Sequence, residues 1–277
     1  MEKRGFTLVE MLGVIAIIGI LSSIVLVSLS SQRQKTRITA GQAMDSSISH
    51  GAIGARMVGE WRLNETTGTK ASDSSGAGLD GTILGGVTLG GDGVESTSFA
   101  FNGSTGVIGI PFGRQMGLLN NQNNVTVTAW IKTGFGSNGN QDIVAHNCQF
   151  VIRLNGTSKN ATFYVCTTTP SVGWRTPVAT PSKSINPNEW TFIAATYDGT
   201  TQSVYINGTL KGSNTSASGL LNTANSEISI GAWSSATPSN IYNGSIDEVR
   251  VYAGALTAEA LGKLYAESAP RHGLATK

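Results

Sequence analysis

Charged side chains are scarce in this sequence. Asp, Glu, Lys and Arg together make up 13 % of its 277 residues, about half of the share that is usual in a soluble domain. Proline is also rare, with 7 residues, whereas glycine is abundant, with 35. A helical bundle needs many charged residues on its exposed faces, so the composition disfavours that fold class. It favours an all-β fold with many turns.

The charge distribution gives no indication of a nucleic-acid partner. The formal net charge is +2, and the basic residues do not cluster with aromatic ones, as they do on nucleic-acid-binding surfaces. The three histidines, His50, His146 and His272, have no spacing that is typical of a metal centre. We therefore expect neither a nucleic-acid-binding protein nor a histidine-based metal site.

One long apolar run stands at the N-terminus. Between Phe6 and Leu29 the only ionisable side chain is that of Glu10. As a helix the run would be about 36 Å long, at about 1.5 Å per residue, which is enough to cross a hydrocarbon core of about 30 Å. Arg4 precedes the run and favours a cytoplasmic N-terminus, although basic residues also follow from Arg33 onward. The sequence predicts a single membrane-spanning helix.

Glu10 is the unusual residue of this helix. An ionisable side chain in a spanning segment is costly without a partner, and such a residue is usually functional. A secretory signal would place its cleavage site after the apolar run, where Ser30 and Ser31 offer only a weak match. Glu10 therefore favours a helix that is retained over a secretory signal that is removed.

The residues around Glu10 form a specific motif. Residues 4–12, RGFTLVEML, combine a basic leader, a glycine, a phenylalanine and a glutamate. The segment closely resembles the prepilin signal of type IV pilins and of type II secretion pseudopilins. The resemblance implies cleavage between Gly5 and Phe6 by prepilin peptidase, followed by N-methylation of Phe6. It also implies a partner for Glu10, the Phe6 ammonium group of a neighbouring subunit, because paired charges are tolerated in an apolar bundle.

From Glu60 onward the pattern changes. Short runs alternate apolar and polar residues between turn residues, which is typical of a β-sandwich or jelly roll. Asn207-Gly208 and Asp198-Gly199 have the composition of tight hairpin turns. Residues 256–266 are expected to form a short amphipathic helix with Thr257 as its N-cap. The predicted strands are residues 125–131, 150–154, 162–165, 190–197, 204–206, 228–230 and 246–252.

The order of several segments in this region is informative about the fold. They are WRLNETTGT from residue 61, DSSG from 73, FNG from 101, VTAWIK from 127, EWTFIAATYDG from 189, VYING from 204 and GSIDEVRVY from 244. Together they resemble the laminin G-like, concanavalin-type jelly roll of bacterial surface proteins. The expected fold is mainly β: a long N-terminal hydrophobic α-helix, a concanavalin-type β-sandwich and a short C-terminal helix. The expected divisions are a prepilin leader (1–5), a transmembrane or filament-core helix with linker (6–58), the jelly roll (59–267) and a C-terminal tail (268–277).

The two cysteines, Cys148 and Cys166, are centred on the same point as the turn between residues 150–154 and 161–165. If these two strands form a hairpin, the cysteines face each other across it. An exported domain meets an oxidising environment, so a disulfide is expected, with two reduced thiols as the alternative.

Asp247 and Asp73 are candidate ligands of a structural calcium ion. In jelly rolls of the resembled type, the aspartate that matches Asp247 often binds calcium, and backbone carbonyls can complete such a site. The alternative for Asp247 is an exposed or turn-capping side chain. Asp73 is the weaker candidate.

An enzyme is not expected, although the resembled fold also occurs in glucanases. A retaining glycosidase needs two carboxylates about 5 Å apart, and the predicted strands contain no acidic pair at even spacing. Asp247 and Glu248 are adjacent, which would place them on opposite faces of a strand.

Three aromatic residues lie in loop-like stretches, Trp174, Trp233 and Tyr242. An exposed aromatic ring can stack on a sugar, although such a ring more often covers the edge of a core. These three residues are weak candidates for ligand binding.

The first functional hypothesis is a structural subunit of a type IV pilus-like filament that displays the sandwich. The alternatives are a minor pilin that binds a surface glycan or protein, and a pseudopilin of a type II secretion-like system. The expected partners are pilin subunits, prepilin peptidase and the inner-membrane assembly machinery. The precursor would be a single-pass protein of the inner membrane, and the assembled filament would be extracellular.

The prepilin motif makes a direct prediction about maturation. Mass spectrometry of the mature protein should find an N-methylated Phe6 as the first residue. Replacing the carboxylate in Glu10→Ala or Glu10→Leu should leave membrane insertion and processing intact but reduce filament yield, since the Phe6 ammonium group loses its partner. A mature N-terminus beyond residue 29, or a normal filament yield from these variants, would contradict the assignment.

Overall fold

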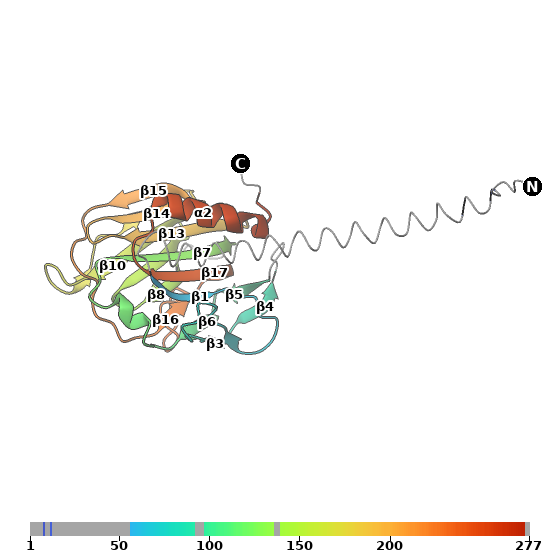
Figure 1. Cartoon of the computed structure of the whole chain (residues 1–277), viewed down its shortest axis with the longest axis horizontal. Helices are drawn as coiled ribbons and strands as arrows, with labels where there is room; N and C mark the ends of the chain where they lie inside the picture. Colours follow the sequence, from blue (N-terminus) through green and yellow to red (C-terminus); the bar gives the residue numbers. More distant parts are fainter. Residues whose placement is uncertain (1–7, 9–11, 13–55, 92–96, 136–138, 275–277) are drawn as a thin grey trace, which may run out of the picture. The chain divides into compact units, whose positions relative to one another are not determined.

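The computed structural model describes Leu8, Leu12 and residues 56–91, 97–135 and 139–274. The expected sandwich is present, and two antiparallel sheets form its layers (Figure 1). The eight-stranded sheet has the order β15 (Thr209–Asn214), β14 (Gln202–Ile206), β13 (Thr191–Tyr197), β7 (Val125–Thr133), β17 (Asn243–Ala253), β5 (Ser98–Asn102) and β4 (Val87–Gly91), and β1 (Arg56–Trp61) pairs with β17.

The nine-stranded sheet faces it. Its order is β11 (Gly173–Trp174), β10 (Asn160–Thr167), β9 (Phe150–Asn155), β8 (Asn140–His146), β16 (Ile228–Ile230), β6 (Val107–Ile110), β3 (Gly81–Leu84) and β2 (Lys70–Ala71), and β12 (Val178–Ala179) pairs with β10. A short 3-10 helix, η1 (Met116–Leu119), precedes β7. All seven strands expected from alternation are present, although their ends shift by a few residues.

Alternation along the strands builds the main core between the sheets. On β9, Phe150, Ile152 and Leu154 point into this core, and on β13 Ile193 and Ala195 do the same. Successive strand residues point to opposite faces, so the residues between them belong to the outer faces. The expected Asn-Gly turn is also found, because Asn207 and Gly208 both have positive φ between β14 and β15.

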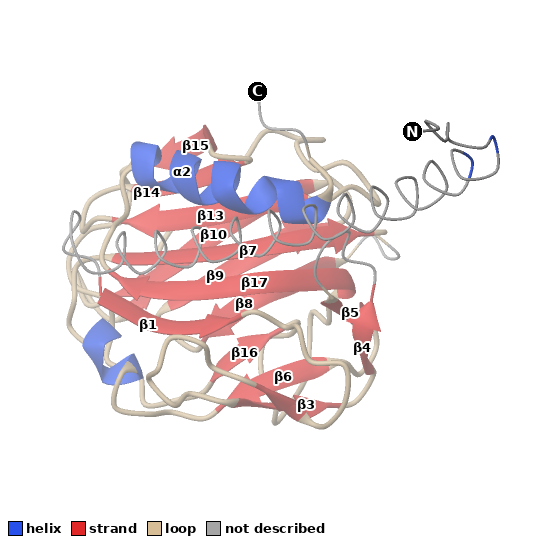
Figure 2. Cartoon of the chain, turned by 45° about the vertical axis from the view of Figure 1, so that its right-hand side comes forward, coloured by secondary structure: helices blue, strands red, loops and turns tan. Residues whose placement is uncertain are grey.

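A second apolar cluster covers the outer face of the eight-stranded sheet. The helix α2 (Ala258–Ser268) lies alongside β13 and β14 (Figure 2). Its Leu261 and Leu264 pack with Trp130 of β7 and Phe192 of β13. Thr257 caps the helix as expected, accepting a hydrogen bond from Ala260 N at 3.2 Å. The central strands β7 and β13 of this sheet are therefore buried on both faces.

The sandwich begins earlier than expected, with β1 at Arg56. Gly59 lies inside this strand. A Cβ atom on Gly59 would come within 2.5 Å of the Trp61 ring. The glycine therefore makes room for the indole, which is fully buried and donates from Nε1 to the Leu79 carbonyl at 2.8 Å.

The disulfide forms between Cys148 and Cys166, with Cα atoms 5.0 Å apart. The hairpin that the sequence predicts is the pair β9 and β10, in which Phe150 lies opposite Val165. Cys148 comes just before the hairpin and Cys166 stands near the end of β10, so the bridge closes the open end of the hairpin.

The expected C-terminal tail is a packed part of the domain. After α2 the chain forms a 3-10 helix, η2 (Ala269–His272), whose Ala269 and His272 are buried. The His272 ring stacks on Trp130 with centroids 4.0 Å apart, and its Nε2 lies 3.0 Å from Asp247 Oδ2. The boundary at residue 267 was wrong, because these contacts anchor the following residues to β7 and β17.

Asp247 and Glu248 of β17 both face this C-terminal segment. A β-bulge interrupts the pairing of β17 with β7 between Asp247 and Arg250, and Glu248 has a φ of 45°. Arg271 donates from Nε and Nη2 to the two Glu248 oxygens at 2.6 and 3.0 Å. The expectation that Asp247 and Glu248 point to opposite faces was wrong, because it assumed a regular strand.

Glu248 also belongs to a buried ion network. Arg250 donates from Nη2 to Glu248 at 3.2 Å and from Nε to Glu60 of β1 at 3.0 Å. Burial raises the pKa of Glu248, but the charges of Arg250 and Arg271 outweigh that effect and lower the pKa to about 2. The network thus joins β1, β17 and the C-terminal segment through one ionised carboxylate.

Replacing Glu248 by glutamine should destabilise the domain in a pH-dependent way. Removing one partner of a buried ion network costs about 3 to 5 kcal/mol. The folded-state pKa lies below the ordinary value of 4.5, so this stability is present above about pH 4.5 and is lost as the pH falls toward 2. Melting temperatures of the wild-type chain and Glu248→Gln, followed by circular dichroism, should therefore converge in acid.

The exposed pair of Glu259 and Lys263 on α2 supplies the control. Glu259→Gln makes the same charge change at the surface, where ion pairs contribute little. A difference between the wild-type chain and Glu248→Gln that stays constant from pH 2 to 8 would contradict the proposed role of the carboxylate.

Candidate functional site

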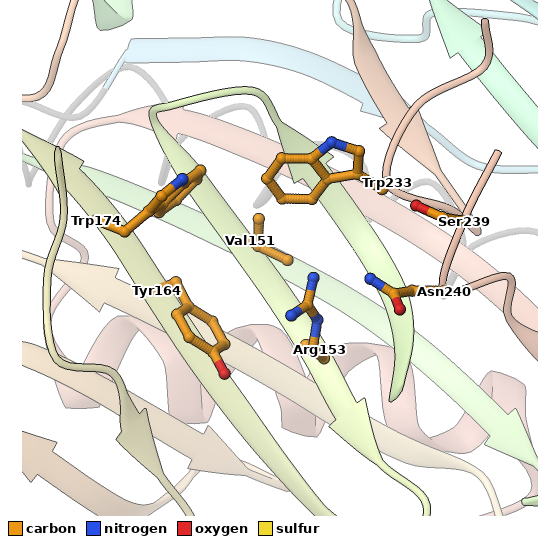
Figure 3. Close-up of a pocket in the computed structure, with 7 residues that line it drawn as sticks. All are labelled: Val151, Arg153, Tyr164, Trp174, Trp233, Ser239 and Asn240. Carbon is orange, nitrogen blue, oxygen red and sulfur yellow. The ribbon is translucent and has the colours of Figure 1, made fainter. Parts of the chain in front are cut away.

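A pocket of about 430 Å³ opens on the outer face of the nine-stranded sheet. Since Phe150, Ile152 and Leu154 of β9 point into the core, Val151 and Arg153 point the other way and form its floor (Figure 3). The volume falls in the range of roughly 300 to 1,000 Å³ that is usual for small-molecule sites. The lining residues are Val151, Arg153, Tyr164, Trp174, Trp233, Ser239 and Asn240.

Two tryptophans form walls of the pocket. Trp174 lies on β11, opposite Cys166 of β10, and Trp233 lies in the loop after β16. Their ring centroids are 5.7 Å apart and the rings are tilted by 57°. Trp174 keeps 38 % of its surface exposed. The structure therefore brings together two of the three aromatic residues that were predicted as ligand-binding candidates, although 59 positions separate them.

A buried ion pair lies at the floor. Arg153 of β9 stands directly opposite Asp142 of β8. It donates from Nε to Oδ1 at 2.5 Å and from Nη2 to Oδ2 at 3.1 Å. The guanidinium carbon also lies 5.3 Å from the Tyr164 ring centroid and 6.0 Å from that of Trp233, which is the range of cation–π contacts.

Asp142 is held on several sides. Asn240 donates from Nδ2 to Oδ2 at 3.1 Å and accepts the Asp142 backbone N–H at 2.7 Å. Burial raises the pKa of Asp142, while Arg153 and Asn240 oppose that rise. Burial lowers the pKa of Arg153, but the hydrogen bond to Asp142, the charge of Asp142 and the interactions with Tyr164 together outweigh it, so the net shift is upward.

The walls are fixed by contacts outside the pocket. Glu227 accepts hydrogen bonds from the hydroxyls of Ser229, Ser234 and Ser235 and from the Ser235 backbone N–H. These bonds tie down the loop that carries Trp233. Burial raises the pKa of Glu227, yet the hydrogen bonds from Ser235 and the other serines lower it overall.

Trp174 has its own anchor next to it. Arg175 donates from Nε to the Thr167 hydroxyl at 2.6 Å and from Nη2 to the Thr167 carbonyl at 2.8 Å. Cys166, which forms the disulfide with Cys148, lies directly opposite Trp174. Both tryptophan walls are therefore held in place by the protein.

Tyr242, the third aromatic candidate, does not reach the pocket. Its side chain is fully buried and meets Phe101 edge to face, with centroids 6.0 Å apart. Its hydroxyl donates to the Ser245 carbonyl at 3.3 Å. The ligand-binding expectation for Tyr242 was wrong, because the loop-like composition around it conceals a core position just before β17.

Sequence reasoning missed Arg153, Tyr164 and Asn240. The sequence did point to Arg153, because an arginine at an outward position of an otherwise apolar strand needs a partner. The partner, Asp142, lies on β8, which alternation did not predict. Asn240 carried no signal in the sequence, since it reaches the site through a loop.

The two candidate calcium ligands lie elsewhere. The Asp73 carboxylate accepts the backbone N–H groups of Glu60, Ser75 and Leu79 at 2.9 to 3.1 Å. Asp247 is fully buried and meets His272, so the alternative of an exposed Asp247 was wrong. Within residues 56–91, 97–135 and 139–274, His, Cys, Asp and Glu form no group of three that could hold a metal. Calcium binding stays a prediction.

A family model described as the concanavalin A-like lectin/glucanases superfamily matches residues 101–262, more than half of the chain. The chain belongs to this superfamily. A second model, the prokaryotic N-terminal methylation motif, matches residues 1–26. This concanavalin A-like chain therefore carries a prepilin-type N-terminus, which implies a membrane-anchored precursor.

Solved structures agree with the fold. Domain 4 of AbnA, an extracellular arabinanase of Geobacillus stearothermophilus in complex with arabinotriose, has a TM-score of 0.54 and 23 % identity, covering 76 % of this chain and 98 % of that chain. The binding domain of botulinum neurotoxin DC in complex with SialylT has a TM-score of 0.59 and 14 % identity, covering 79 % and 52 %. The binding domain of Paraclostridial Mosquitocidal Protein 1 has a TM-score of 0.57 and 18 % identity, covering 76 % and 51 %.

These likenesses concern the fold alone, because every identity is low. The chain spans about half the length of the two toxin chains. No curated protein matches the sequence.

The predicted processing and assembly residues Gly5, Phe6 and Glu10 lie outside the described residues. Leu8 and Leu12 are helical, and their side chains are 78 % and 62 % exposed. Among the residues whose structure is described, no helix is long and apolar enough to span a membrane. The N-terminal assignment therefore rests on the methylation motif.

The calcium prediction can be checked by thermal unfolding. If Asp247 or Asp73 helps to bind the ion, calcium at 100 times its dissociation constant should stabilise the folded domain by about 2.7 kcal/mol. The melting temperature should rise with added calcium and fall when EGTA removes it, with magnesium as the control ion. A melting temperature that changes neither with calcium nor with the chelator would refute the prediction.

Proposed function

We propose that the chain is a subunit of a type IV pilus-like filament that presents a carbohydrate-binding sandwich at the cell surface. The observation that carries the proposal is the joining of two parts in one chain. A prepilin-type motif at residues 1–26 precedes a concanavalin A-like domain whose outer sheet face bears a pocket with two tryptophan walls.

The N-terminal part supports assembly. In a filament, Glu10 would pair with the methylated Phe6 ammonium group of a neighbouring subunit, and this pair would fix the register between helices. Prepilin peptidase would act first, on the cytoplasmic side of the inner membrane. The sandwich would then travel with the filament to the exterior.

The pocket supports sugar binding. Sugar rings present flat C–H surfaces that stack on aromatic faces and hydroxyl groups that need polar partners. Trp174 and Trp233 offer the faces, and Arg153 and Asn240 offer the polar groups. Such a mixture of aromatic walls and a few fixed polar groups is common in small-molecule sites. Two solved structures with a similar fold are complexes, one with arabinotriose and one with SialylT.

The same pocket favours binding over catalysis. Glycoside hydrolysis needs two carboxyl groups beside the scissile bond. None of the seven described residues that line the pocket carries a carboxyl group, and the nearby Asp142 is fully buried against Arg153. A minor pilin that acts as an adhesin fits this arrangement better than a pseudopilin, which would have no need of an exposed ligand pocket.

Filaments with altered pockets would test the proposal. Trp174→Ala and Trp233→Ala should assemble normally, because neither residue belongs to the N-terminal helix. Truncating an aromatic anchor costs about 2 kcal/mol or more of binding energy, so each variant should bind sugar roughly 30-fold more weakly. The measurement compares filaments sheared from cells in a glycan-array assay.

Phe112 supplies the matched control, since it is an aromatic residue with 40 % exposure that does not line the pocket. Phe112→Ala filaments should bind as the wild type does. Filaments that bind no glycan, or that bind equally well without either tryptophan, would overturn the binding role. A chain that never enters filaments would overturn the structural role.

A further inference from the structure

The floor of the pocket carries a cation whose charge is already balanced. Arg153 meets both oxygens of Asp142 through two different nitrogens, in the side-on geometry that suits a guanidinium and a carboxylate. The Asp142 side chain is fully buried, whereas 18 % of the Arg153 side chain stays exposed. The carboxylate therefore lies beneath the surface and the guanidinium faces the pocket.

No second charge accompanies this pair at the pocket surface. The other described lining residues are Val151, Tyr164, two tryptophans, Ser239 and Asn240, which carry no charge at neutral pH. Asn240 adds its own hydrogen bond to the Asp142 carboxylate at 3.1 Å, so the acid is held in place beside the arginine. The net charge of the floor and walls is thus close to zero.

This arrangement distinguishes between ligands. A hydroxyl group needs only a hydrogen-bond partner, and a guanidinium has five N–H donors, of which Asp142 engages those on two nitrogens. The carboxylate of an acidic sugar would gain from the Arg153 charge but would be repelled by the Asp142 charge immediately behind it. It would also exchange its water shell for an apolar pocket, which is costly for an anion without a net cationic partner.

We propose that the pocket selects uncharged sugars over anionic ones because Asp142 neutralises the arginine at its floor. The proposal rests on the proposed function and adds the chemical class of its ligand. Asp142 acts through Arg153, so it is a positioning and specificity-determining residue without contact to the sugar.

The experiment uses the full chain in a detergent without a sugar head group, because such head groups would compete for the pocket. Isothermal titration calorimetry compares matched pairs of probes: lactose with sialyllactose, and galactobiose with digalacturonic acid, with arabinotriose as an additional neutral probe. The neutral member of a bound pair should bind at least about ten-fold more tightly than the acidic one. The affinity of the acidic member should not rise between high and low salt, since the floor offers it no net charge.

Asp142→Asn tests the cause of the selection. The amide keeps the shape and the contact with Asn240 but leaves Arg153 uncompensated, so the acidic probes should gain at least about ten-fold in affinity and lose that gain at high salt. Asp80→Asn is the matched control, because it removes an acidic charge at an exposed pair with Lys70 that does not line the pocket. It should leave both affinities unchanged.

The outcomes separate the two proposals. Tryptophan-dependent binding with a preference for the acidic probes in the wild-type chain would overturn the selectivity and leave the sugar-binding role standing. No binding to any probe would overturn both. If Asp142→Asn does not fold, the acidic probes decide in the wild-type chain: their affinity should not rise as the salt concentration is lowered, and a rise would contradict a neutral floor.

Discussion

The eight-stranded sheet carries apolar side chains on both faces, and the need to cover them shapes the rest of the domain. Its inner face packs on the nine-stranded sheet, and its outer face lies under α2 and the C-terminal 3-10 helix. Burial of apolar surface contributes about 25 cal/mol per Å², so neither cover can be removed cheaply. The pocket lies on the outer face of the nine-stranded sheet, which α2 does not cover.

Several of the few charged side chains of the sandwich form buried ion pairs. Glu60, Glu248, Arg250 and Arg271 form one buried network, and Asp142 with Arg153 forms another ion pair. A buried charge is tolerated only when it is paired and hydrogen-bonded. The first network fastens the C-terminal segment over β17. The second fixes Arg153 at the floor of the pocket.

The N-terminal run and the sandwich both contain acids in apolar surroundings, and in both places such an acid needs a partner. In the N-terminal apolar run, Glu10 is the single acid, and a second subunit is proposed to supply its partner. In the sandwich, each buried acid finds its partner within the chain. This difference supports the proposal that the N-terminal segment takes part in assembly and that the sandwich binds a ligand.

The sequence by itself determined the features that local chemistry fixes. Alternation predicted strands such as β7 and β13, Asn207-Gly208 predicted its turn, and the hairpin of β9 and β10 predicted the disulfide. The tertiary structure alone decided the pocket, because Asp142 and Asn240 meet although 98 positions separate them. It also buried Tyr242 and folded back the C-terminal residues onto Trp130. Local periodicity states which face of a strand is apolar, but it does not state which strands become neighbours, and a bulge such as that at Glu248 reverses the face without any mark in the pattern.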